Sequence, residues 1–211
     1  MAITNGYATL AEVKAAARIS DTVDDALIET ATETASRLVD EYCERRFFTN
    51  GTEVRTYSPQ SYFTLEVDDI ASTPITLKTS TQFDGSTFDI TWTTADYQAE
   101  PTTRQTSGIA WPITRLRAIG SQLFTPPDAA YYMKASMPVT AQVTAVFGFG
   151  TAVPTQVKHA TILLALRQFQ RYNSPSGVIG FGDFAVRVGT RMDPDVEAIL
   201  RPFRRSPVGA A

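Results

Sequence analysis

The sequence has a single cysteine and a single histidine, and this scarcity excludes several kinds of site. Cys43 alone cannot form a disulfide within the chain, and its position on an apolar helix face predicts a small core residue. His159 alone cannot supply a two-histidine metal site. No Gly-x-Ser-x-Gly sequence accompanies it to suggest a serine hydrolase. We therefore expect no enzymatic activity, no metal and no cofactor.

Long hydrophobic runs are also missing. No apolar stretch approaches the roughly 20 residues that a membrane span needs, and no charged-then-apolar signal peptide opens the chain. We expect a soluble protein that is made in a reducing cytoplasm and has no membrane partner. Hydrophobic residues make up 43% of the 211 residues and charged residues 19%, which is typical of a folded chain with one large domain or two small ones.

Charge is unevenly distributed along the chain, although the net charge is only −3. Residues 1–50 carry five Lys and Arg against nine Asp and Glu, a net charge of −4. Residues 155–211 carry eight against four, a net charge of +4. An acidic head and a basic tail suit contacts between copies or with a charged partner. A surface pattern without a role explains them equally well.

Two helices are predicted near the N-terminus. Thr9 and Glu12 form a capping-box pattern, so a short helix should run from Leu10 to Arg18. Ser20 or Asp21 should cap a second helix, which occupies the stretch 25–47. Its apolar residues recur every three or four positions, which places them on one face. They are Leu27, Ile28, Ala31, Ala35, Leu38, Val39, Tyr42 and Cys43.

Between residues 51 and 147 the apolar period changes to two, which indicates antiparallel strands with one wet face. The alternating residues are Phe63, Leu65 and Val67; Ile75 and Leu77; Phe88, Ile90 and Trp92; and Val139, Ala141, Val143, Ala145 and Phe147. Turn sequences such as Asp84-Gly85 separate these runs. We expect a compact β domain with Tyr97, Trp111 and Leu116 in its core.

The last third of the chain again has a helical pattern. Pro154 suits the first turn of a helix that should end near Asn173. Its predicted buried stripe is Val157, Ala160, Thr161, Leu164 and Phe169. Asp193 and Pro194 form a cap and first-residue pair for a last short helix, which Pro202 should close.

Residues 174–192, between these two helices, are rich in glycine and carry more apolar side chains than the segment can bury locally. These are Val178, Ile179, Phe181, Phe184 and Val186. An extended apolar arm can add a strand to another chain, and we favour this intermolecular role. The alternative is a hairpin that lies on the protein's own helices.

Three further motifs have a plain interpretation. The pairs Asp24-Asp25 and Asp68-Asp69 could bind a divalent cation, but adjacent carboxylates at a helix start or in a turn are more often caps or solvated residues. The segment 177–182 is superficially similar to a phosphate-binding loop. It lacks the following Lys and Ser or Thr, so we interpret it as a hinge.

Nucleic-acid binding requires a basic stripe, and the arginines form only two small groups. Arg167 and Arg171 are four residues apart on one helix, and Arg201, Arg204 and Arg205 cluster near the end. The sequence pI of about 5.2 argues against tight, sequence-specific DNA binding. We expect transient non-specific contact with DNA, or pairing of these arginines with carboxylates on a neighbouring copy or partner.

The order of these elements resembles the head-to-tail connector (adaptor) proteins of tailed double-stranded DNA bacteriophages. The likeness is carried by residues 7–14 (YATLAEVK), 24–28 (DDALI), 41–47 (EYCERRF), 147–150 (FGFG), 153–154 (VP), 157–160 (VKHA) and 199–205 (ILRPFRR). Together these motifs span nearly the full length of the chain. Each is loose and hydrophobic, so their order and spacing carry the likeness.

The resemblance implies a structural virion protein at the head-tail interface. Such proteins form a ring, usually dodecameric, beneath the portal, where the ring continues the channel for genomic DNA and docks the stopper or another neck or tail protein. Their C-terminal segment commonly reaches towards the portal. Here that segment is roughly 191–211, with Arg201, Phe203, Arg204 and Arg205 as candidate contacts. The Thr-rich middle departs from the minimal all-helical members of the family.

We therefore predict an α+β protein, in which a small helical bundle from the N- and C-terminal segments carries an inserted antiparallel β domain. The bundle comprises residues 1–50 and 153–205 with the arm 174–192, the insert comprises 51–152, and 206–211 form a flexible tail. Two other functions remain open. One is a neck or minor tail protein that docks through the β insert. The other is a carbohydrate- or receptor-binding module, suggested by Tyr62, Trp92, Tyr97 and Trp111 among Thr-rich strands.

Overall fold

The structure, a computed structural model, describes residues 3–80, 87–106, 108–125, 140–173, 178–179, 186–187 and 193–205. The chain forms two compact units. Met1–Phe47 together with Val153–Ala211 make the first, which we call the helical unit, and Phe48–Ala152 make the second, the sheet unit. The mixture of helices and an antiparallel sheet confirms the predicted α+β class.

Helix α1 spans Leu10–Ala17 and begins with the predicted capping box. The Thr9 hydroxyl accepts a hydrogen bond from the Glu12 amide at 3.2 Å, and a Glu12 carboxylate oxygen accepts one from the Thr9 amide at 2.8 Å. The two side chains therefore satisfy amides that a helix start leaves without partners.

Helix α2 spans Asp25–Cys43, so it is shorter than the predicted stretch that ends at Phe47. It ends because Glu44 adopts a left-handed conformation, with φ of 55°, and bonds back to the Asp40 carbonyl. The prediction of a Ser20 or Asp21 cap is wrong. The Asp21 carboxylate instead accepts from the Val23 amide, in the turn that precedes the helix.

Most of the predicted apolar face of α2 is buried, but not all of it. Ile28, Ala35, Val39 and Cys43 have no exposed surface, as expected. Leu27 is 38% exposed, although its neighbour Ile28 in the same turn is fully buried, so Leu27 lies at the edge of the covered face.

Helix α3 spans Thr155–Asn173 and ends where the sequence predicts. Pro154 lies one residue before the helix, and its carbonyl accepts the Lys158 amide. Val157, Ala160, Thr161 and Leu164 are buried as predicted, whereas Phe169 is only half-buried. Helix α4 (Pro194–Leu200) has the predicted cap, since the Asp193 carboxylate accepts from the Asp195 amide at 3.0 Å.

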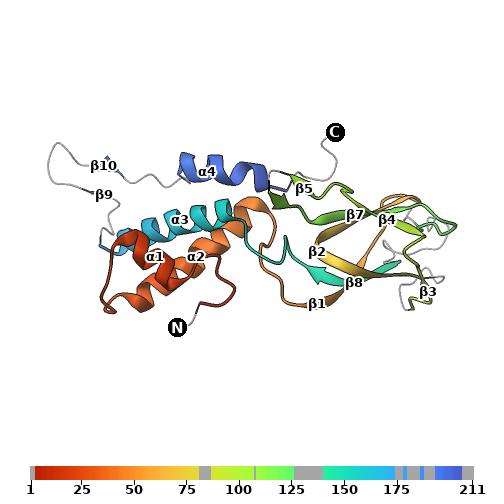
Figure 1. The fold of residues 1–211 in the computed structure, drawn as a ribbon, viewed down its shortest axis with the longest axis horizontal. Coiled ribbons are helices and arrows are strands. Elements are labelled where there is room, and N and C mark those ends of the chain that lie inside the picture. Colours follow the sequence, from red (N-terminus) through yellow and green to blue (C-terminus); the bar gives the residue numbers. More distant parts are fainter. Residues whose placement is uncertain are drawn as a thin grey trace. The chain divides into compact units, whose positions relative to one another are not determined.

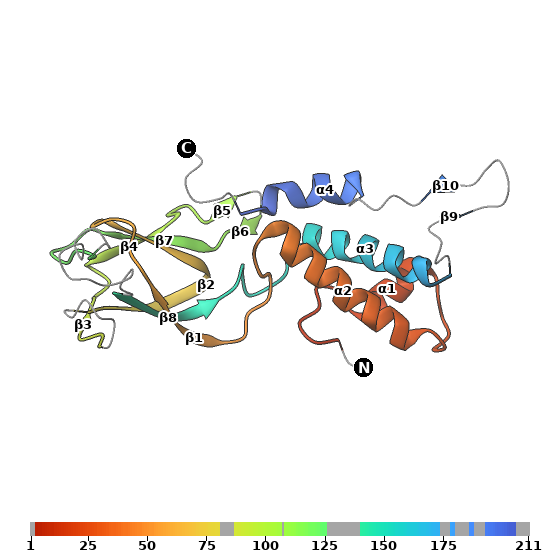
Figure 2. The ribbon, with the colours of Figure 1, turned by 180° about the vertical axis from the view of Figure 1, so that it is seen from behind.

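The helices of the helical unit pack against one another, as Figures 1 and 2 show. Helix α3 contacts α1, α2 and α4, so segments from both ends of the chain share one core. A short 3-10 helix, η3 (Arg201–Phe203), follows α4. An ion pair at 2.8 Å between Lys158 of α3 and Glu12 of α1 joins the two ends at the surface. None of the helices in the described part of the chain is long and apolar enough to cross a membrane.

The sheet unit contains a six-stranded antiparallel sheet in the order β1-β8-β2-β7-β4, with β3 paired to β2. The strands are β1 (Thr52–Tyr57), β2 (Thr64–Thr79), β3 (Ile90–Thr91), β4 (Tyr97–Glu100), β7 (Ile113–Ala118) and β8 (Ala141–Phe147). A separate pair consists of β5 (Gln105–Thr106) and β6 (Ile109–Ala110). The predicted run 88–92 is thus a strand over only two residues.

Strand β2 is the centre of the sheet and changes its pairing along its length. Its first part pairs with β7 and its second part with β8, with register shifts between Glu66 and Ile70, between Ile70 and Ser72, and between Ser72 and Thr76. Pro74, which has no amide to donate, lies within the last of these irregularities. Such irregularities bend a strand, so β2 can pair with β7 along its first part and with β8 along its second part.

One face of the sheet supplies the core of the sheet unit, and the predicted alternation accounts for it. Leu65, Leu77, Leu116 and Val143 have no exposed surface. Of the three predicted core residues, Tyr97 (8% exposed) and Leu116 are buried, while Trp111 is half-buried and meets Phe149 edge-on. The opposite face is exposed to solvent and carries positive and negative side chains that pair across strands. One such pair is Arg117 with Glu100, at 2.7 Å.

Gly148 connects β8 to the chain that leaves the sheet unit, and only glycine fits there. Its φ is 134°, a conformation that other residues rarely adopt. A Cβ atom at this position would lie 2.3 Å from the Phe48 carbonyl oxygen. The Gly148 amide donates to the Asp69 carbonyl at 2.8 Å. At the FGFG motif (147–150), the backbone at Gly148 therefore passes close to the backbone at Phe48.

Candidate docking surfaces

The C-terminal segment 193–205 is folded onto the helical unit. Phe203 is 2% exposed, and its ring meets the Phe47 ring edge-on with centroids 6.0 Å apart. The Arg205 amide donates to the Cys43 carbonyl at 2.8 Å, which is the end of α2. In the single chain Phe203 is a core residue, so its side chain is not accessible to a partner.

The candidate arginines of this segment lie at or near the surface. Arg201 is exposed, and Arg204 pairs with Glu44 at 3.3 Å while its guanidinium lies 5.9 Å from the centre of the Tyr42 ring. Both partners in the Arg204 ion pair are more than half exposed. Water screens such a pair strongly, so the pair contributes little free energy. A carboxylate of another protein can therefore replace Glu44 as the partner of Arg204.

The predicted arm contains two short strands, β9 (Val178–Ile179) and β10 (Val186–Arg187), which pair antiparallel. Val186 is opposite Ile179, and Arg187 is opposite Val178. The backbone here therefore forms the strands of a hairpin. Phe181 and Phe184, the aromatic residues assigned to the arm, lie outside the described residues.

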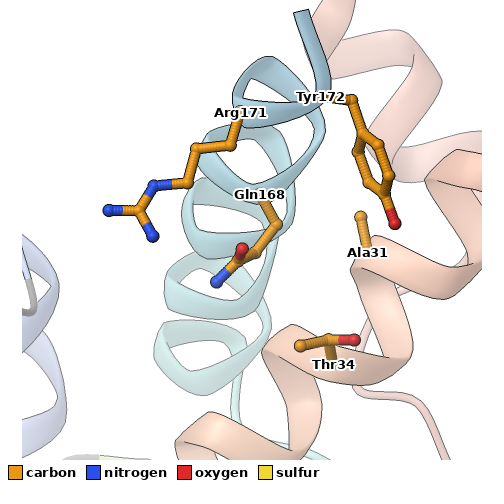
Figure 3. Close-up of a pocket in the computed structure, with 5 residues that line it drawn as sticks. All are labelled: Ala31, Thr34, Gln168, Arg171 and Tyr172. Atoms are coloured by element: carbon orange, nitrogen blue, oxygen red, sulfur yellow. The ribbon is translucent and has the colours of Figure 1, made fainter. Parts of the chain in front are cut away.

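A groove lies between α2 and α3 in the helical unit. Its volume is about 330 Å³, and its lining residues are Ala31, Thr34, Gln168, Arg171 and Tyr172. Figure 3 shows Ala31 and Thr34 on α2 and the other three on α3. Tyr172 is 53% exposed, so its ring forms a projecting wall. We call this feature the helical groove. The sequence did not reveal it, because a groove depends on how two helices face each other.

One end of the sheet unit carries exposed apolar side chains that the sequence also did not single out as a surface. Tyr62, Phe63, Ile119 and Leu123 are 46%, 60%, 55% and 50% exposed. We call these four residues the sheet-end patch. Phe63 was expected to continue the buried alternation of Leu65 and Val67. It instead directly precedes Thr64, the first residue of β2, and lies outside the buried core.

The structure shows ion-pair partners for two of the four acidic residues considered as cation ligands. Asp25 pairs with Lys14 at 2.5 Å, and Asp68 pairs with Arg55 at 2.8 Å. No group of three or more His, Cys, Asp or Glu that could hold a metal ion occurs in the part of the chain that the structure describes. His159 is exposed on α3.

The aromatic residues proposed for a carbohydrate-binding module do not form an exposed set. Trp92 is 4% exposed, stacks on Phe124 with ring centroids 4.5 Å apart, and donates its indole N–H to the Thr79 hydroxyl. Tyr97 is buried and donates its hydroxyl to the Ile75 carbonyl. These are core aromatics with satisfied polar atoms, so a carbohydrate- or receptor-binding module is not favoured.

Comparison with known proteins confirms the resemblance to head-to-tail connectors. Residues 7–83 match the family model of phage gp6-like head-tail connector proteins, a range that covers α1, α2, β1 and β2. A comparison with curated proteins gives no match.

Two solved structures share the fold over the whole chain. One is a chain from the neck of an empty gene transfer agent (GTA) particle computed with C6 symmetry: it is 17% identical, with a TM-score of 0.56, and the match covers 100% of this chain and 96% of that one. The other is from the virion of a native GTA particle, at 17% identity, a TM-score of 0.55 and the same coverage. Since both matches include residues 48–152, the sheet unit is part of the shared fold.

Proposed function

Because the N-terminal part of the chain matches the connector family and the whole chain has the fold of a particle-neck protein, we propose that this protein is a structural adaptor in the neck of a tailed phage or phage-like particle. The observation that carries the proposal is the family match over residues 7–83, which includes both N-terminal helices and the first two strands. The adaptor has no catalytic role and requires no cofactor.

The proposed adaptor works as a ring of copies beneath the portal, where it continues the DNA channel and docks the stopper or another tail-side protein. The neck chain of similar fold belongs to an assembly computed with C6 symmetry, which is compatible with six or twelve copies. A twelve-membered ring is the copy number that we propose. The opposite charges of residues 1–50 and 155–211 allow each copy to attract its neighbour.

The proposed portal contact uses the exposed arginines at the end of the helical unit. Arg201 and Arg204 project from the short segment that follows α4, and Arg205 adjoins them. Arginine is suited to this role because its guanidinium forms two parallel hydrogen bonds with a carboxylate. The arm residues Val178, Ile179, Phe181, Phe184 and Val186 remain candidates for a strand added to the portal or to a neighbouring copy.

In the proposed ring, DNA passes through the channel without sequence-specific recognition. The net charge of −3 favours weak, transient contact with the phosphate backbone over retention of the genome. We therefore expect weak binding of this chain to DNA that disappears as salt is raised.

Sedimentation velocity of the purified chain mixed with portal rings from the same particle tests the proposal. We expect the chain to sediment with the portal. Replacing Arg201 and Arg204 by Glu should weaken binding about tenfold or more at low salt, and by less at high salt, because salt screens exposed charges. Arg117→Glu, an exposed arginine of the sheet unit, is the matched control. Equal loss in both variants would contradict the assignment of the portal contact.

A further inference from the structure

The dipeptide Asn-Gly occurs twice in the chain, at Asn5-Gly6 and at Asn50-Gly51. An asparagine that precedes glycine can lose its side-chain amide without an enzyme. The backbone nitrogen of the glycine attacks the asparagine Cγ atom, and glycine has no Cβ atom to hinder the approach. By sequence the two sites are chemically equivalent, but the structure places them in very different surroundings.

The backbone at Asn5-Gly6 is held in place. The Asn5 carbonyl accepts a hydrogen bond from the Arg37 guanidinium at 2.9 Å. Gly6 is packed so closely that a Cβ atom there would lie 2.3 Å from the Ile3 Cγ2 atom, and the next residue, Tyr7, is 2% exposed. Rotation about the Cα–C bond of Asn5 moves its carbonyl and the Gly6 nitrogen together, because the peptide group is planar. The Gly6 nitrogen therefore cannot reach the Asn5 side chain unless the bond to Arg37 breaks.

The backbone at Asn50-Gly51 is open by comparison. Both residues are exposed, and they precede the first paired residues of β1, Thr52 with Val146. Gly51 has a φ of 89°, and in the described part of the chain no atom lies within 4 Å of the position that a Cβ atom there would take. Rotation at Asn50 therefore meets little resistance from its surroundings.

We propose that Asn50 is a site of spontaneous deamidation in the folded protein, and that Asn5 is protected from the same reaction. The Gly51 backbone nitrogen bonds to the Asn50 Cγ atom, and the Cγ–Nδ2 bond breaks. The proton of the Gly51 amide ends on the departing ammonia, and a cyclic succinimide remains. Water then opens the ring at either of its carbonyl–nitrogen bonds, which produces aspartate or isoaspartate at position 50. Water is the only co-reactant.

Deamidation changes both the charge and the chain path at this site. Either product adds one negative charge to the net charge of −3. Isoaspartate also adds a methylene group to the main chain, because its backbone runs through the former side chain. The change falls between Phe48, whose carbonyl lies close to Gly148, and Thr52, the first residue of β1. Since this segment joins the helical unit to the sheet unit, the modification alters their covalent connection. The chemistry does not depend on the proposed adaptor function.

Peptide mapping by mass spectrometry tests the site, after warm incubation of the native full-length chain at mildly alkaline pH. We expect deamidation at Asn50, with isoaspartate among the products. Asn5 should react about tenfold more slowly or less, because its segment must first open locally. In urea, which unfolds both segments, the two sites should react at similar rates. Equal rates in the native chain, faster reaction at Asn5, or a native Asn50 that does not react would each overturn the proposal.

A pair of variants gives a second readout. Asn50→Gln replaces an exposed side chain and should leave the fold unchanged. Glutamine cyclises far more slowly than asparagine, so the more acidic species that anion exchange separates from the aged native protein should form several-fold more slowly in this variant. Asn5→Gln is the matched control and should age at the rate of the native chain. Formation of the acidic species at equal rates in both variants would contradict the assignment to Asn50.

Discussion

The ring of Phe203 meets the ring of Phe47 edge-on, with centroids 6.0 Å apart, and so joins the last described segment of the chain to the end of the N-terminal helical region. Tyr7 meets Phe47 from another direction, at 5.6 Å, and its hydroxyl accepts the Phe47 amide. Three residues that are distant in sequence thus form one aromatic cluster in the core of the helical unit.

The first prediction concerns this cluster. Phe203→Ala removes a side chain that is 2% exposed and leaves a cavity, so it should lower the free energy of unfolding by about 3 kcal/mol. Urea denaturation followed by circular dichroism measures the change. Arg201→Ala, an exposed neighbour, should change stability by less than about 0.5 kcal/mol. Equal stability of the two variants would show that Phe203 is not anchored in the core.

The second prediction concerns Gly148. Alanine there would have a strained backbone, and its Cβ would lie 2.3 Å from the Phe48 carbonyl oxygen. Gly51 has a φ of 89° but open space around it, so Gly51→Ala incurs only the backbone strain. We expect Gly148→Ala to destabilise the protein by more than about 1 kcal/mol and by more than Gly51→Ala does, as measured by thermal unfolding. A larger loss of stability in Gly51→Ala than in Gly148→Ala would contradict the close approach of Gly148 to Phe48.

The third prediction concerns the single thiol. Burial raises the pKa of Cys43 to about 12, so the thiolate that reacts with thiol reagents is nearly absent at pH 8. Cys43 also has no exposed surface. Labelling by a thiol reagent at pH 8 should therefore be orders of magnitude slower in the native protein than in urea, and should report unfolding of the helical unit. Rapid labelling of the native protein would contradict this burial.

The fourth prediction concerns pH. The hydrogen bond from Lys158 is the main reason that the pKa of Glu12 lies below its usual 4.5. A lowered carboxyl pKa stabilises the folded state above the unfolded pKa, and this contribution is lost as the pH falls through the folded pKa. Glu12→Gln should thus be less stable than the native chain by at most about 1 kcal/mol at pH 7, and equally stable once the pH lies below the folded pKa of Glu12. Urea titrations over a series of pH values test this; a stability difference that does not depend on pH would contradict it.

Local patterns in the sequence predicted the elements well, and the reasons are physical. The capping box at Thr9, the Asp193-Pro194 start of α4 and the alternation of Ala141, Val143 and Ala145 each act within a few residues, so they can be read without knowledge of the fold. The premature end of α2 could not be read in this way, because Glu44 in a left-handed conformation is unusual for a residue other than glycine.

Features that depend on packing between distant segments were not predicted. Tyr7 is an example: burial raises the pKa of its hydroxyl group, which donates to the Asp40 carboxylate and accepts the Phe47 amide. Nothing local marks this residue as a core hydrogen-bonding centre. The sheet-end patch was missed for the same reason. Phe63 follows the strand alternation, and only the sheet shows that the core stops before it.

The central claim of this account is that the chain is a ring-forming adaptor that docks on a portal. Electron microscopy of the full-length chain mixed with portal rings from the same particle tests it most directly. We expect an additional annular layer on one face of the portal, built of copies of this chain around the portal axis. Portal rings without added density, with the folded chain still monomeric at high concentration, would contradict the claim.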